Sequence, residues 1–337
     1  MADRRRATHS FPMEIPMTPV RRHASRTSHR RPLAPLACAV MLLLGSGVAS
    51  AQDAAALDAP ADEPSLQDPP PANSGKLLLT GGVTQVEGAA GGGLTPWAVI
   101  GGHGTRDQIG ATAFYTRVDV SDYGLDSFGA LVGIRDRVEL SVSRQAFDTR
   151  SVGTALGLGQ GFTIRQDTFG VKVRVAGDAV LEQDRWMPQV AVGVQHKRND
   201  QGGLLAAIGA KDDSGTDIYV SATKLYLRQS LLLNATVRFT EANQFGILGF
   251  GGDRHDGLRP QFEASAAYLL NRHLAIGAEY RQKPNNLGIA REDDAWDVFV
   301  AWAPSRHVSL TVAYVDLGNI VIRDHQRGVY ASLQVGF

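Results

Sequence analysis

The sequence predicts an all-β fold, a transmembrane up-and-down antiparallel β-barrel of about fourteen strands, with twelve as the fallback. Three observations predict it. From Lys76 onward apolar and polar residues alternate with a period of two, short connections alternate with long ones, and the last strand ends in an aromatic residue. No stretch after Ala51 holds the ~18 apolar residues of a membrane helix. Strands must therefore make any crossing of a membrane.

Residues 1–51 have the pattern of a secretory signal peptide. Residues 1–32 carry eight Arg and two acids, an apolar run extends from Leu33 to Val48, and the small residues Ala49–Ala51 follow. A basic start, a short apolar core and an A-x-A end are typical of export signals, so cleavage is expected before Gln52. The alternative is a retained inner-membrane anchor, which the glycines in the apolar run disfavour.

Residues 52–75 carry five acids and no base and are rich in Ala and Pro, so we expect a flexible periplasmic lead-in. Cys38 is the only cysteine, and it lies in the predicted signal peptide. The processed chain would keep 26 basic residues (34 less eight) and 32 acidic ones (34 less two), a net charge of −6. This balance argues against nucleic acid as a partner.

The barrel domain is predicted to cover residues 76–337. Its strands are placed at 76–86, 94–103, 107–118, 126–135, 137–147, 164–175, 186–198, 216–226, 229–240, 259–270, 273–283, 294–303, 306–316 and 327–337. Long external loops are expected at about 148–162, 199–214, 241–257, 284–293 and 317–326. Aromatic residues at outward positions near strand ends suit girdles at the two membrane interfaces: Trp186, Tyr268, Trp296, Trp302 and Tyr314.

The final stretch, from Arg327 to Phe337, has one apolar face. That face comprises Val329, Ala331, Leu333, Val335 and Phe337. The stretch resembles the C-terminal targeting signal of Gram-negative outer-membrane proteins, which implies recognition by the barrel-assembly machinery. The alternative is an ordinary sandwich strand at the end of the chain.

Residues 76–110, and above all the segment GGVTQVEGAAGGGLTPWAVIGG, resemble a family of proteobacterial outer-membrane proteins. It is known as the domain-of-unknown-function family numbered three thousand and thirty-four. The resemblance implies an outer-membrane barrel in a Gram-negative cell, with outer-membrane lipid around it. It brings no established activity, ligand or catalytic residue.

Nine charged residues are predicted to line the lumen: Arg135, Glu139, Lys172, Arg174, Arg238, Glu263, Glu279, Arg281 and Asp297. Charges within a membrane span are costly unless they are paired or wet. Their mixed signs fit a weakly selective aqueous pore or a closed lumen crossed by ion pairs, and the sequence does not separate the two.

No motif for catalysis or cofactor binding stands out. The run Gly88 to Gly93 lacks the order of a phosphate loop and is expected to form a tight external turn. No G-x-S-x-G turn exists, and the His and Asp residues of the loops have no recognised ligand spacing. We therefore expect no enzyme, no cofactor and no metal.

The sequence thus favours an outer-membrane porin-like channel for passive passage of small solutes. The apolar, Gly-rich loop from Gln244 to Gly252 suits either a constriction folded inward or a greasy external entrance. It motivates a second hypothesis, uptake of hydrophobic compounds. A third is a non-conducting structural or adhesive barrel that binds a partner through its loops. A homo-oligomer stays open, because oligomer interfaces and lipid-facing surfaces give the same strand pattern.

Overall fold

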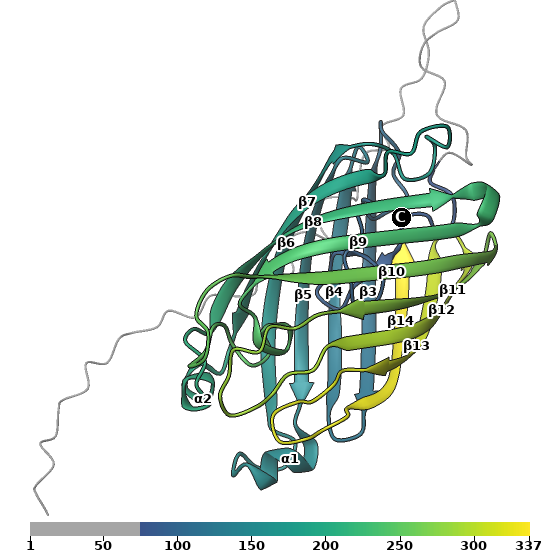
Figure 1. Cartoon of the computed structure of the whole chain (residues 1–337). Coiled ribbons are helices and arrows are strands. Elements are labelled where there is room, and N and C mark those ends of the chain that lie inside the picture. Colours follow the sequence, from purple (N-terminus) through teal and green to yellow (C-terminus); the bar gives the residue numbers. More distant parts are fainter. Residues whose placement is uncertain (1–74) are drawn as a thin grey trace, which may run out of the picture. The chain divides into compact units, whose positions relative to one another are not determined.

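The computed structural model describes residues 75–337, so the predicted signal peptide and nearly all of the predicted lead-in lie outside the described residues. Twelve antiparallel strands form a closed barrel in which each strand pairs with its sequence neighbours and the last pairs with the first (Figure 1). They are β3 (Ile109–Val120), β4 (Gly124–Ile134), β5 (Val138–Asp148), β6 (Thr163–Ala176), β7 (Gln189–Asn199), β8 (Ser214–Tyr226), β9 (Leu231–Thr240), β10 (Arg259–Asn271), β11 (Leu274–Arg281), β12 (Ala295–Ser305), β13 (Val308–Asp316) and β14 (Arg327–Gly336).

The predicted fold class is confirmed, and the strand number is the fallback of twelve. Each wall strand overlaps one of the last twelve predicted strands. The first two, 76–86 and 94–103, are wrong as wall strands. They contain or adjoin only the short strands β1 (Val83–Thr84) and β2 (Ala90–Gly91), which pair with each other apart from the barrel. A wall strand exposes every second side chain to lipid, whereas residues 83–101 are all buried.

The outer surface of the wall is apolar. On β12 the alternate residues Trp296, Val298, Val300 and Trp302 are exposed, while Phe299 between them is buried. The wall strands are 8 to 14 residues long, which suits tilted strands that cross the hydrocarbon core of a bilayer. Closure satisfies the backbone hydrogen bonds of every wall strand without an exposed edge, as a lipid environment requires. The barrel therefore spans a membrane through its strands.

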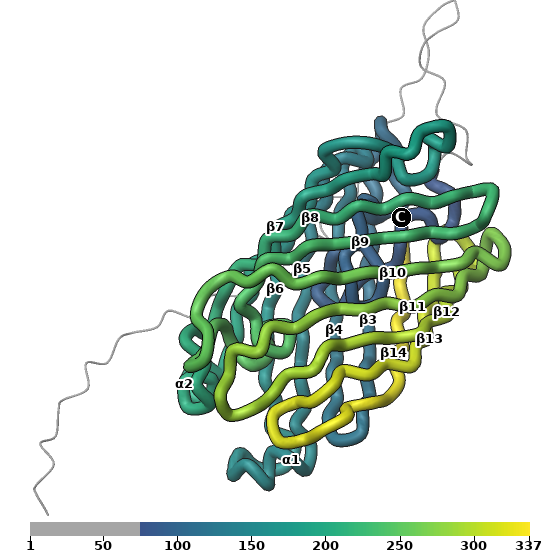
Figure 2. Tube along the Cα trace, in the orientation of Figure 1, coloured from purple at the N-terminus to yellow at the C-terminus, as the bar shows by residue number. Residues whose placement is uncertain are grey.

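The two ends of the barrel differ (Figure 2). One end carries Phe337, tight turns and the 3₁₀ turn η2 (Leu227–Gln229). We call it the periplasmic end, after the orientation expected from the sequence. The other, the external end, carries α1 (Arg150–Ala155), α2 (Gly202–Ala207) and η3 (Asn243–Gly246). The predicted rhythm of connections fails twice, because residues 121–123 form a short external turn and residues 177–188 a long periplasmic connection. No helix in the described range is long and apolar enough to cross a membrane.

Candidate functional site

Residues 76–104, which we call the plug, fold into the barrel from one end and return to it. Residues 83–101 of the plug are all buried. The backbone N–H of Lys76 donates to the carbonyl of His103 over 3.1 Å, so the first and last parts of the plug meet at the periplasmic end. The chain thus enters the lumen and leaves it by the same end.

Wall side chains bind the backbone of the plug. Glu139 on β5 accepts the N–H groups of Ala90 (3.0 Å) and Gly101 (2.8 Å). Lys172 on β6 donates to the carbonyls of Ala90 (2.8 Å) and Trp97 (3.2 Å). The same two side chains form an ion pair of 3.1 Å. A predicted pair of lumen charges therefore serves as an anchor for the plug.

A second anchor lies across the lumen, on β10 and β11. Glu279 accepts from the N–H of Leu94 (2.8 Å) and from the hydroxyl of Thr95 (2.6 Å). The hydroxyl oxygens of Thr95 and Ser265 are 2.5 Å apart. A Cβ on Gly92 would come within 1.9 Å of the Glu279 carboxylate, so any other residue here would displace this anchor. The expected external turn at Gly88–Gly93 is therefore wrong: this run lies inside the barrel, where it needs glycine to pass close to the wall.

Six charged side chains, one from the plug and five from the wall, form a network inside the barrel. Glu87 of the plug pairs with Lys197 and with Arg281 (2.9 Å), and it lies 3.8 Å from Arg238. Asp217 lies 2.7 Å from Lys197, and Glu263 lies 2.5 Å from Arg238. All six side chains are at most 3% exposed. The network balances three cations with three carboxylates, as buried charge requires.

The structure places eight of the nine predicted lumen residues inside the barrel wall. Arg174 is among them, at the periplasmic rim, where it pairs with Asp136 over 2.8 Å. Arg135 is the exception: it is exposed in the β4–β5 turn with φ +51°, because the strand ends one residue earlier than predicted. The sequence prediction missed Glu87, Lys197 and Asp217. Lys197 and Asp217 lie on the same face of their strands as inward residues such as Gln195. The alternation along these strands could therefore have predicted them.

The loop between β9 and β10 closes the lumen from the external side. Residues 242–252 are buried except for the half-buried Phe245. The carbonyl of Phe245 accepts from Lys197 (3.1 Å) and Gln166 (3.2 Å), and its ring lies under the guanidinium of Arg281 at 4.0 Å. Of the two sequence expectations for this loop, the structure shows the inward-folded one.

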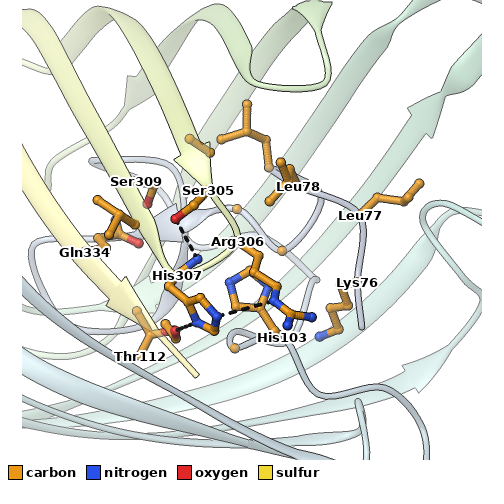
Figure 3. Close-up of a pocket in the computed structure, with 17 residues that line it drawn as sticks. Lys76, Leu77, Leu78, His103, Thr112, Ser305, Arg306, His307, Ser309 and Gln334 are labelled. Carbon is orange, nitrogen blue, oxygen red and sulfur yellow. Dashed lines mark hydrogen bonds between the residues drawn. The ribbon is translucent and has the colours of Figure 1, made fainter. Parts of the chain in front are cut away.

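A polar pocket of about 490 Å³ lies at the periplasmic end, between the foot of the plug and the β12–β13 turn (Figure 3). His307 contacts the carbonyl of Gly336 through Nδ1 at 2.9 Å, and Lys76 pairs with Asp136 at 2.6 Å. Burial lowers the pKa of His103, and the nearby His307, Lys76 and Arg306 lower it further. The pocket marks the place where the plug joins the wall.

The predicted outward residues lie on the outer surface. Val329, Ala331, Leu333 and Phe337 are exposed and Val335 is half-buried. Tyr268, Trp296, Trp302 and Tyr314 are also exposed. Trp186 is exposed too, but it lies in the connection before β7 rather than on a strand. The prediction that Trp186 belongs to a girdle depended on a position near the end of a strand, and Trp186 does not lie on a strand.

The sequence profile of the family described as "Protein of unknown function (DUF3034)" matches residues 80–334. The chain belongs to this family. The match covers residues 80–104 of the plug together with nearly all of the wall, so the similarity to the family includes the plug sequence. No curated protein sequence matches the chain.

Solved structures similar to this chain include two porins and an enzyme. The KdgM porin is 10% identical with a TM-score of 0.44, covering 67% of this chain and 99% of its own. The NanC porin is 10% identical with a TM-score of 0.41, covering 68% and 99%. The outer membrane phospholipase A from Escherichia coli is 10% identical with a TM-score of 0.36, covering 68% and 92%. Similarities this weak carry over neither solute nor activity.

The closed antiparallel wall, its apolar outside and its polar inside make this chain an outer-membrane barrel of porin-like form, surrounded by lipid. Within that form the plug is its most distinctive feature. Among the described residues, no group of three or more His, Cys, Asp or Glu is arranged to hold a metal ion.

Proposed function

We propose that this protein is a porin-like outer-membrane channel for small polar solutes, closed by its own plug and opened when the plug withdraws toward the periplasmic end. The observation that carries the proposal is that the plug enters and leaves by one end, with Lys76 and His103 hydrogen-bonded to each other. A segment inserted in this way can leave the lumen without being threaded through it.

The contacts that hold the plug support this motion. Besides the burial of apolar plug residues such as Trp97, they are hydrogen bonds and ion pairs from wall side chains rather than a β-ladder with the wall. Water that enters as the plug leaves can replace such contacts, because a hydrogen bond to a charged group contributes about 1.5–3 kcal/mol over the bond to water. The wall would stay closed throughout, and its charges of both signs would favour a weakly selective path.

The rival proposal is a non-conducting barrel whose plug is a permanent core. A disulfide between plug and wall separates the two. The hydroxyls of Thr95 on the plug and Ser265 on β10 are 2.5 Å apart, so a T95C/S265C variant is suited to cross-linking. The matched control is T116C/S332C, where hydroxyls 2.8 Å apart join β14 to β3 within the wall.

In planar bilayers we expect stepwise openings from the unmodified protein. Oxidised T95C/S265C should be silent and should recover with reductant, while oxidised T116C/S332C should conduct like the unmodified protein. A silent unmodified protein that still shows heat-modifiable gel mobility would support the permanent core. Openings that persist in the oxidised plug variant would show that passage does not require the plug to move.

Three further roles belong to this proposal. The outward residues of β14 would be the signal read by the barrel-assembly machinery, and the aromatic residues near strand ends would form interfacial girdles. A homo-oligomer would use part of the same apolar outer surface. Cross-linking in intact outer membranes tests the oligomer, which would give a ladder of discrete bands.

A further inference from the structure

The interior of the barrel changes character at the external end. There a small apolar hollow, open to solvent, lies between the wall and the inward-folded loop. Val118 and Val120 of β3 and Phe147 of β5 form its wall side. Ile247 and Leu248 form its loop side. These five residues are at most 7% exposed.

The hollow offers a ligand almost no polar partner. The hydroxyl of Tyr123 already donates to the carbonyl of Ile320 at 3.0 Å. The amide of Gln244 is also engaged: its oxygen accepts from Lys283 at 3.0 Å and its nitrogen donates to the carbonyl of Asn319 at 2.5 Å. A molecule bound here would have to leave any polar group of its own unpaired, which is unfavourable. The hollow therefore selects against polar solutes.

Its aromatic surfaces suit a flat apolar ligand. The rings of Tyr123 and Phe147 stack at 5.1 Å, and the ring of Phe245 contributes to the same lining. Offset stacking and edge contacts between aromatic rings add to area burial. Pockets lined in this way by apolar and aromatic side chains are the usual form of small-molecule sites.

The loop beneath the hollow has a strained backbone. Gln244 and Phe245 adopt φ +45° and +61°, a region that residues with a side chain rarely occupy, and Gly246 follows at φ +102°. Such strain persists only where the surroundings hold it, and it often lies at ligand-binding sites. Phe245 also contacts Lys197 and Arg281, which are partners of Glu87, so the loop borders the charge network.

We propose that this hollow is a binding site for a small apolar molecule, of the size and shape of a single aromatic hydrocarbon ring, which enters from the external side. The site does not rest on the proposed channel, because a closed barrel can bind such a ligand. It goes beyond passage of polar solutes, since the chemistry of the hollow excludes them.

Photolabelling tests the site in the full protein, in outer-membrane vesicles, with 3-trifluoromethyl-3-phenyldiazirine as the apolar probe. Mass spectrometry then locates the labelled peptides. We expect labelling around Phe147, Leu248 and Ile320 to saturate and to be displaced by toluene. Labelling of the lipid-facing Val298 and Val312 should rise in proportion to the probe, which provides an internal reference.

Leu317 also lines the hollow, so two filling variants, Val120→Phe and Leu317→Trp, place extra bulk in it. Val312→Phe adds bulk on the outer surface, where Val312 is 53% exposed. We expect the saturable component to fall at least tenfold in both filling variants and to persist in Val312→Phe. Labelling of the hollow that never saturates, or that folded filling variants retain, would overturn the proposal. If neither filling variant folds, failure of toluene to displace the probe from the unmodified protein would overturn it as well.

Discussion

Two levels of the same lumen are held together by different forces. In the middle, Glu87 of the plug meets Lys197, Arg238 and Arg281, and all are buried. At the external end, the loop meets the wall through apolar side chains such as Leu248. Loss of one partner from a buried charge network leaves the others uncompensated, whereas loss of apolar contact acts in proportion to the atoms removed. The charge network therefore suits a plug that is either fully in or fully out of the lumen. The apolar contacts suit a surface that adapts to a ligand.

The largest effect should follow from Glu87→Ala, which removes one of three carboxylates from the middle level. Breaking a buried ion pair from one side costs about 3–5 kcal/mol, because the remaining charge has no partner. We expect the plug to leave the lumen for a measurable fraction of the time. The rate of maleimide labelling of a cysteine at Val86, which is 2% exposed, reports it: V86C alone should react slowly, and V86C with Glu87→Ala should react several times faster.

Asp126→Asn provides the control, since it removes a carboxylate that pairs with Arg117 (2.6 Å) on the outer surface. Its V86C form should remain protected. Equal protection in the Glu87→Ala protein, with an intact barrel, would mean that the charge network does not hold the plug.

A smaller, local effect is expected at the apolar level from Leu248→Ala. Truncation of a buried leucine costs about 2–5 kcal/mol, depending on how far the site collapses. Amide hydrogen exchange should accelerate in residues 243–250 and stay unchanged in β5 and β6. The V86C reporter should also remain protected in this variant. Its labelling would contradict the idea that the two levels fail independently.

The wall could be predicted from the sequence because each of its strands alternates between two environments. On β12, Trp296, Val298 and Val300 face lipid and Asp297 faces inward, and a period of two records this directly. The plug could not be predicted in that way. Val86, Glu87 and Ala89 are all buried, so polar and apolar residues there follow local partners rather than a repeating face.

The site was predicted in part for the same reason. The alternation of apolar and polar residues along the strands placed Glu139, Lys172 and Glu279 inside the barrel. It does not indicate what a residue of the lumen binds. Glu139 and Glu279 prove to accept backbone N–H groups of the plug, contacts 38 to 185 residues apart in sequence. Partners so distant are set by the closure of the barrel. The sequence alone therefore left a wet pore and a closed lumen equally supported.

The external loop should respond to pH through Glu292. Its carboxylate accepts from the N–H of Gln244 at 3.0 Å and is close to Lys283. Burial raises the pKa of Glu292 to about 7, against the attraction of Lys283. The inward-folded loop then binds more protons than an open loop, whose glutamate has a pKa near 4.5. Closure should therefore be strongest below pH ~4.5 and should weaken as the pH rises to about 7.

Hydrogen exchange of residues 244–248, corrected for the intrinsic pH dependence of exchange, measures this closure. Burial lowers the pKa of Lys283 to about 8, so the lysine stays protonated throughout the acidic window. The Glu292→Gln variant should show a flat profile from pH 5 to pH 7. A slope that survives in this variant would assign the pH response to another group.

The smallest effect is expected from an exposed ion pair on the outer surface, which can be compared with a buried ion pair between the same two strands. Between β5 and β6, Arg144 and Asp167 pair on the outer surface (2.6 Å; 54% and 39% exposed), while Glu139 and Lys172 pair inside (3.1 Å; both 1% exposed). We expect Arg144→Ala to change the free energy of unfolding by about 0–1 kcal/mol, because solvent screens exposed pairs. Lys172→Met should lower the free energy of unfolding several times more, because it leaves the buried Glu139 without its ion-pair partner and removes a plug anchor. Urea titration followed by gel mobility compares the two variants. Equal unfolding midpoints would refute the claim that burial inside the lumen makes these charges contribute more to stability.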